Sequence, residues 1–103
     1  MDSVYLASAG GRSGKSVISL GLALNHPGSA GFYKPFRESM LKVGGETMDE
    51  DAFLMAEALG LGEGGKISPF VYDPFEPVSI GEIAAVYEEL SIGKDLMIIE
   101  GNK

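Results

Sequence analysis

A glycine-rich segment that ends in a lysine and a serine is the part of this sequence best suited to chemistry. It reads Ala7-Ser8-Ala9-Gly10-Gly11-Arg12-Ser13-Gly14-Lys15-Ser16. An apolar run (residues 4–6) precedes it, and a run of helical character (residues 17–24) follows it. A strand, a glycine-rich loop, Gly-Lys-Ser and a helix together are the layout of a phosphate-binding loop.

This layout suits a nucleotide for physical reasons. Small residues let backbone N–H groups turn inward around a polyphosphate, and the start of a helix adds unsatisfied N–H groups. Lys15 would reach the terminal phosphates, and the Ser16 hydroxyl would ligate Mg²⁺. We therefore expect ATP and Mg²⁺ as cofactors. The expected nucleotide-binding residues are Ser8, Gly10, Gly11, Arg12, Ser13, Gly14, Lys15 and Ser16.

The loop departs from the usual pattern G-x-x-x-x-G-K-[ST] at one position. The first glycine of that pattern would be residue 9, and Ala9 stands there. The alternative interpretation is a Gly/Ser turn between a strand and a helix, with Lys15 in solvent.

Three further residues are candidates for the same site. Lys34 follows the short apolar run that begins at Ala30, Asp51 lies at the start of a helical pattern, and Glu100 ends the apolar run 96–99. Carboxylate and hydroxyl oxygens are the ligands that Mg²⁺ prefers. An acid that closes an apolar strand is also the placement expected for the second metal-supporting motif of P-loop ATPases. We therefore expect Ser16, Asp51 and Glu100 to bind the metal.

The elements that would position these residues alternate along the chain. Strands are predicted over residues 4–8, 30–35 and 95–99, and a helix over residues 15–25. A polar glycine-rich loop follows Pro35. Thr47 with Glu50, and Ser79 with Glu82, match capping boxes that would open two further helices, the first of which would end at Gly60.

The order β-α-β-α-α-β predicts an α/β fold with a P-loop NTPase-type parallel sheet flanked by helices. Active groups in such sheets gather beyond the C-terminal ends of the strands, where the loop, Lys34 and Glu100 would all lie. Residues 1–103 read as a single domain. Because the third strand ends close to the last residue, we expect the N-terminal part of a longer domain, with sheet edges that a downstream domain or a second copy would complete.

Composition narrows the class of partner. The chain has 103 residues, a net charge of −7 and no cysteine. An acidic chain argues against nucleic acid, and no apolar run approaches the length of a membrane span. Together with the lack of a signal-peptide pattern, this suits a cytoplasmic protein. Four basic residues are expected to form a local positive pocket for a small anion: Lys15, Lys34, Arg37 and Lys42. The aromatic residues Phe32, Tyr33, Phe36, Phe70, Tyr72 and Phe75 are interpreted as core and loop packing.

These motifs resemble dethiobiotin synthetase. The closer resemblance is to the dethiobiotin-synthetase-like N-terminal domain of phosphotransacetylases and of DRTGG-domain proteins. The matching segments are residues 8–16, 31–35, 51–52, 76–79 and 98–101, in the order of the family. The loop of that family also has an extra residue before Gly-Lys-[ST], so that Ser8 would stand at its first glycine.

The resemblance implies a role for each matching residue. Lys15 would bind phosphates and act in catalysis, Ser16, Asp51 and Glu100 would surround Mg²⁺, and Lys34 would be the second catalytic residue, on the substrate side. In a synthetase, that lysine helps to hold a diamine or its carbamate. Here Glu38 replaces an expected serine, and a carboxylate is a poor neighbour for a carbamate.

Three functions are therefore weighed. The first is a magnesium-ATP-binding P-loop domain with a regulatory or accessory role. The second is an ATP-dependent ligase of the dethiobiotin synthetase type. The third is a non-catalytic interaction fragment that pairs its open sheet edges. Enzymatic activity is left open by the sequence.

Overall fold

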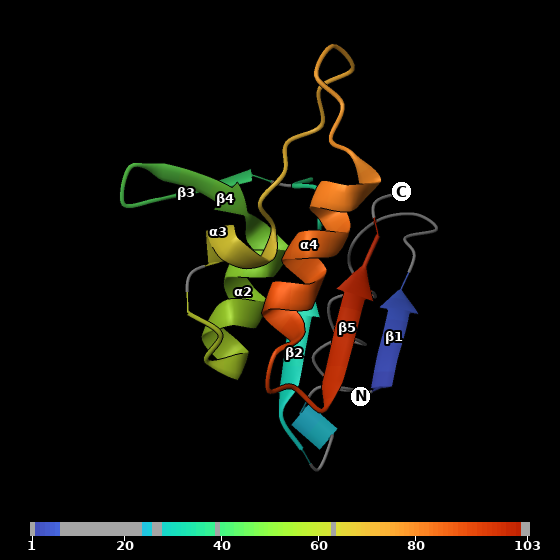
Figure 1. The fold of residues 1–103 in the computed structure, drawn as a ribbon. Helices are drawn as coiled ribbons and strands as arrows, with labels where there is room; N and C mark the ends of the chain where they lie inside the picture. The colour runs from blue at the N-terminus through green and yellow to red at the C-terminus, as the bar shows by residue number, and fades with distance from the viewer. Residues whose placement is uncertain (1, 7–23, 26–27, 39, 63, 102–103) are drawn as a thin grey trace.

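The centre of the fold is a parallel sheet of three strands (Figure 1). The computed structural model describes residues 2–6, 24–25, 28–38, 40–62 and 64–101. The strands β1 (Asp2–Leu6), β2 (Ala30–Tyr33) and β5 (Leu96–Glu100) lie in the order β1-β5-β2. All three predicted strands are present, and their parallel pairing confirms the expected α/β class.

The apolar core forms between this sheet and the helices that follow β2. Side chains alternate along a strand, so Phe32 of β2 and Leu96 and Ile98 of β5 share one face. They pack with Ala52, Met55 and Ala56 of α2 (Glu50–Leu59) and with Ile67 of α3 (Gly64–Ile67). This packing fixes α2 beside the end of β2.

A β-hairpin precedes α2 where the sequence predicted a loop. The strands β3 (Met40–Val43) and β4 (Glu46–Asp49) pair antiparallel around Gly44 and Gly45, whose φ values are 58° and 87°. A two-residue turn with positive φ at both positions matches the twist of a hairpin, and glycine adopts it without strain.

The hairpin overturns the predicted start of α2. Thr47 lies within β4, so it does not cap the helix. Asp49 is the N-cap instead, and its Oδ1 accepts a hydrogen bond from the Ala52 N–H at 2.9 Å. The predicted end is confirmed, since Gly60 terminates α2 in the left-handed conformation.

The helix α4 (Ile80–Ser91) begins at the predicted capping box. The Ser79 Oγ accepts a hydrogen bond from the Glu82 N–H, and the Glu82 carboxylate accepts one from the Ser79 N–H. The helix packs against β2 (Figure 1). The Tyr33 hydroxyl of β2 donates a hydrogen bond to the Ile83 carbonyl of this helix at 2.9 Å. The α4 helix therefore holds the residue immediately before Lys34.

Part of the predicted aromatic packing is wrong. Phe32 and Tyr33 are buried, and the rings of Phe36 and Phe70 lie 5.9 Å apart. However, Tyr72 and Phe75 are 72% and 90% exposed on the segment that leads to α4. The loop therefore takes its shape from its prolines and turns rather than from burial of these rings.

The predicted helix over residues 15–25 falls almost wholly outside the described residues. Leu24 and Asn25, at its predicted end, are helical. Among the helices that the structure describes, none combines the length and the apolar character that a membrane crossing requires.

Candidate functional site

The C-terminal edge of the sheet brings two predicted site residues together. Tyr33 pairs with Ile99, so the next residues of the two strands, Lys34 and Glu100, lie level with one another. Lys34 Nζ lies 3.7 Å from Glu100 Oε1, and both residues are buried. On the other side of β5, Leu6 pairs with Glu100, which puts the end of β1 at the same edge.

Lys34 is the centre of a cluster of carboxylates. Its Nζ lies 3.0 Å from Asp49 Oδ2 and 3.3 Å from Asp51 Oδ2, in addition to Glu100. The Oε1 atom of Glu38, four residues further along the chain, lies 3.4 Å from the same Nζ, and this side chain is partly exposed. Lys34 itself is 1% exposed. A single ammonium group therefore faces four acids in a nearly dry environment.

The position of Asp49 follows from its two structural roles. Its Oδ1 caps α2 through the Ala52 N–H, and its Oδ2 accepts a hydrogen bond from the Glu38 N–H at 2.8 Å. The hairpin brings Asp49 to the site, and the same residue starts the helix that carries Asp51. The loop after β2, the hairpin and α2 are thus joined at one carboxylate.

The role of Asp49 was not predicted from the sequence. Asp49 was not among the predicted site residues, because the segment before it was taken for a loop. The glycine pair at residues 44–45, which suits a tight two-residue turn, is the signal that could have revealed the hairpin. An aspartate three residues before Ala52 also fits an N-cap.

The charges around Lys34 decide its protonation. Burial alone lowers the pKa of Lys34, because it disfavours the charged form. The hydrogen bond to Asp49 and the charges of Asp49, Asp51 and Glu100 outweigh burial and raise this pKa above its usual value. Lys34 is therefore a cation at neutral pH and does not act there as a base.

The expected pocket of positive charge is wrong for the residues that the structure describes. Lys34 is surrounded by carboxylates, and Arg37 donates hydrogen bonds to the carbonyls of Ser68 and Thr47 at 2.8 Å and 3.0 Å. Lys42 lies exposed on β3. Arg37 thus ties the hairpin to the segment after α3 rather than serving a ligand.

The remaining predicted residues lie outside the described part of the chain. These are Ser8, Gly10, Gly11, Arg12, Ser13, Gly14, Lys15 and Ser16. Of the predicted metal ligands, Asp51 and Glu100 therefore meet at Lys34. Within the described ranges, no group of three or more histidine or acidic side chains is arranged to hold a metal ion.

A scan of the sequence against protein-family models gives no match. Function must therefore be inferred from the residues of the site. A buried ammonium group with several carboxylates can have a structural role or a role in binding a metal ion. It could stabilise the junction of β2, β5 and α2, or it could hold acidic oxygens ready for a divalent cation beside a nucleotide.

Proposed function

We propose that this chain is a magnesium-ATP-binding domain of the P-loop type with a regulatory or accessory role. One observation carries the proposal: Asp51 and Glu100 both contact Lys34 at the edge of the sheet where β1 ends beside Glu100. Residues 7–16, which have the composition of a phosphate-binding loop, follow β1 directly in the sequence.

The residues divide the binding of the nucleotide between them. Lys15 and the loop amides would hold the phosphates, and the Ser16 hydroxyl would contribute one oxygen to Mg²⁺. Asp51 and Glu100 would supply carboxylate oxygens, either directly or through water, as suits a hard cation that keeps part of its hydration shell. The resemblance to dethiobiotin-synthetase-like domains supports the same division.

The surroundings of Lys34 favour an accessory role over a ligase. A carbamate would need an uncompensated cation, but Asp49 and Glu38 approach Nζ to 3.0 Å and 3.4 Å. A carbamate bound at Nζ would lie close to these carboxylates, and like charges repel strongly at short range in a buried site. Lys34 is better suited to keep the acidic residues together than to hold a substrate anion.

Calorimetry with magnesium-ATP tests the proposal. Lys15→Ala should weaken binding by about 1.5–3 kcal/mol, or roughly tenfold to a hundredfold, because a charged phosphate contact is lost. Lys42→Ala is the matched control, since Lys42 is exposed on the hairpin, and it should leave the affinity unchanged. Equal affinities for the wild-type chain and Lys15→Ala would reject the proposal.

The role of the metal can be tested in the same titration. With a chelator in place of Mg²⁺, ATP should bind more weakly to the wild-type chain. In Asp51→Asn, with folding checked by circular dichroism, this difference should shrink because one carboxylate is lost. ATP binding that is indifferent to Mg²⁺ in the wild-type chain would contradict the assigned roles of Asp51 and Glu100.

A further inference from the structure

Lys34 occupies the position that a cation would take among the buried carboxylates. Its Nζ lies 3.0 Å from Asp49 Oδ2, 3.3 Å from Asp51 Oδ2 and 3.7 Å from Glu100 Oε1. These oxygens come from the end of β4, from α2 and from β5, so that three elements converge on one ammonium group. Carboxylate oxygens are the ligands that a hard divalent cation prefers, and here they already have a cation.

A metal ion and this ammonium group compete for the same oxygens. Mg²⁺ binds oxygen at about 2.0–2.1 Å in a nearly octahedral arrangement. With Nζ at 3.0–3.7 Å from three of the oxygens, the two cations would lie close together and repel one another. The side chains of Asp49, Asp51 and Glu100 are at most 5% exposed, so water screens this repulsion poorly. A free divalent ion therefore has to displace the ammonium group before it binds these carboxylates.

The backbone of Lys34 is held in place, so a response to a metal is confined to its side chain. The Lys34 N–H donates to the Ile67 carbonyl at 2.8 Å, and the preceding residue, Tyr33, is bonded to α4 through its hydroxyl. The side chain of Glu38 is 24% exposed and lies 3.4 Å from Nζ, on the side of the cluster that water reaches. The ammonium group can thus keep an acidic partner while it withdraws toward solvent.

We propose that Lys34 keeps free divalent cations away from Asp51 and Glu100, and that Mg²⁺ enters only together with a nucleotide. The second part rests on the proposed function. A metal that arrives with a triphosphate brings anionic oxygens of its own, which offset the added positive charge. A metal that arrives alone brings none, and it meets an ammonium group that the carboxylates already stabilise. Lys34 would thus set the order in which the metal and the nucleotide bind.

Binding of Mn²⁺ in the absence of nucleotide tests the first part. Mn²⁺ suits the same oxygen ligands as Mg²⁺, and electron paramagnetic resonance measures the unbound ion. Lys34→Gln should bind one Mn²⁺ roughly tenfold or more tightly than any site of the wild-type chain does, because its carboxylates lack a cation. Lys42→Gln changes the net charge equally at an exposed position of the hairpin and should bind as wild type does. The proposal is overturned if the two variants bind Mn²⁺ alike.

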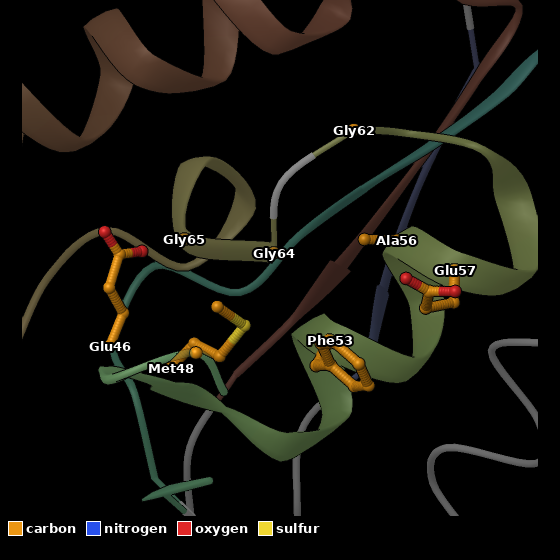
Figure 2. A pocket seen from close by; sticks show the side chains of 9 residues that line it. Glu46, Met48, Phe53, Ala56, Glu57, Gly62, Gly64 and Gly65 are labelled. Atoms are coloured by element: carbon orange, nitrogen blue, oxygen red, sulfur yellow. The ribbon is translucent and has the colours of Figure 1, made fainter. Parts of the chain in front are cut away.

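Exposed acids provide a second control, because an acidic chain attracts Mn²⁺ to its surface. Glu46 and Glu57 are exposed and line a separate cavity of about 380 Å³ between the hairpin, α2 and α3 (Figure 2). Adding Glu46→Gln to Lys34→Gln should keep the new Mn²⁺ site, whereas adding Asp51→Asn should remove it. A site that survives Asp51→Asn would lie elsewhere and would overturn the proposal.

The wild-type chain gives a readout that does not depend on the folding of a variant. Its urea midpoint should be the same in MgCl₂ and in NaCl of matched ionic strength, because free Mg²⁺ gains no site in the folded chain. MgCl₂ with ATP should raise the midpoint above that in ATP alone. An equal rise with MgCl₂ alone would overturn the exclusion of free metal. A new Mn²⁺ site in Lys34→Gln, beside a wild-type chain that binds no ATP, would support that exclusion and reject the proposed function instead.

Discussion

Lys34 shows how one residue joins the fold to the proposed function. Taking an ammonium group out of water costs several kcal/mol, and close carboxylates offset this cost only when the geometry is good. Four acids lie within 3.7 Å of Nζ, so removing one of them leaves the lysine paired. Removing the lysine, in contrast, leaves buried carboxylates that repel one another. The cluster should therefore respond very differently to loss of its cation and to loss of one anion.

Lys34→Met should destabilise the chain by about 3–5 kcal/mol, the usual cost of breaking a buried pair from one side. Urea unfolding followed by circular dichroism measures this change. Lys42→Met, at an exposed position of the hairpin, should stay within about 0.5 kcal/mol of wild type. Equal stabilities for the two variants would mean that the carboxylates around Lys34 do not need its charge.

The pH dependence of this difference has a definite sign. The pKa of Lys34 is raised in the folded chain above its ordinary value of 10.5. The stabilising contribution of the charge is thus fully present below that ordinary value, and it is lost as the pH rises through the raised one. On the alkaline side, the advantage of wild type over Lys34→Met should therefore narrow only in strongly alkaline solution.

Tyr33→Phe should cost about 1 kcal/mol at neutral pH, because the hydrogen bond from the hydroxyl to the Ile83 carbonyl is lost. Burial raises the pKa of Tyr33 from 10.0 to about 12. The unfolded chain then ionises first, so wild type should lose stability between pH 10 and pH 12. Tyr33→Phe lacks this effect, and its stability should fall less over the same range. Urea titrations of both proteins at several pH values measure this difference. If the free energy of unfolding falls equally steeply with pH in wild type and in Tyr33→Phe, the prediction is wrong.

At the scale of elements, Asp49 links the hairpin to the helix behind the site. One carboxylate oxygen caps α2 and the other accepts from the Glu38 N–H. An asparagine offers only one side-chain acceptor, and an alanine offers none. The asparagine variant therefore loses the charge and one acceptor, and the alanine variant loses the second acceptor as well.

Asp49→Asn should cost about 1 kcal/mol, and Asp49→Ala about 2–3 kcal/mol, since the alanine loses a helix cap and a second hydrogen bond. Thermal or urea unfolding measures both. The asparagine variant should be tolerated better because Asp51, Glu38 and Glu100 still face Lys34. An asparagine variant as unstable as the alanine variant would show that charge, not capping, gives Asp49 its importance.

The elements also show what the sequence could predict. The strands β2 and β5 carry strong local signals, because each contains an apolar run and has glycines or a proline near its ends. Both were located within two residues. The Ser79–Glu82 capping box is a local motif and was found as predicted. The hairpin was missed because its short strands are half polar and are recognised only by their pairing with one another.

The candidate site was predictable to the extent that it depends on strand ends. Lys34 and Glu100 were expected at one edge because parallel strands end together, and Asp51 was expected on the basis of its place at the start of a helix. The order β1-β5-β2 could not be read from the sequence, and neither could the approach of Asp49, which depends on the hairpin. Contacts between distant segments depend on packing rather than on local patterns.

At the scale of the whole molecule, the order of the strands determines which residues meet at the proposed site. The sheet order sets β5 between β1 and β2, so that the end of β5 is shared by the strand before the predicted loop and the strand before Lys34. The acid at the end of that central strand, Glu100, therefore lies beside the end of β1 on one side and beside Lys34 on the other. The rest of the described fold, from the hairpin to α4, supports this edge by fixing Asp49, Asp51 and Tyr33.

The most direct measurement is a crystal structure of the chain with Mg²⁺ and a non-hydrolysable ATP analogue. We expect the triphosphate to be surrounded by the amides of residues 10–16, with Lys15 on its terminal phosphates. The metal should lie between the Ser16 hydroxyl and the carboxylates of Asp51 and Glu100. A triphosphate bound elsewhere, with residues 10–16 making no contact to it, would contradict the account.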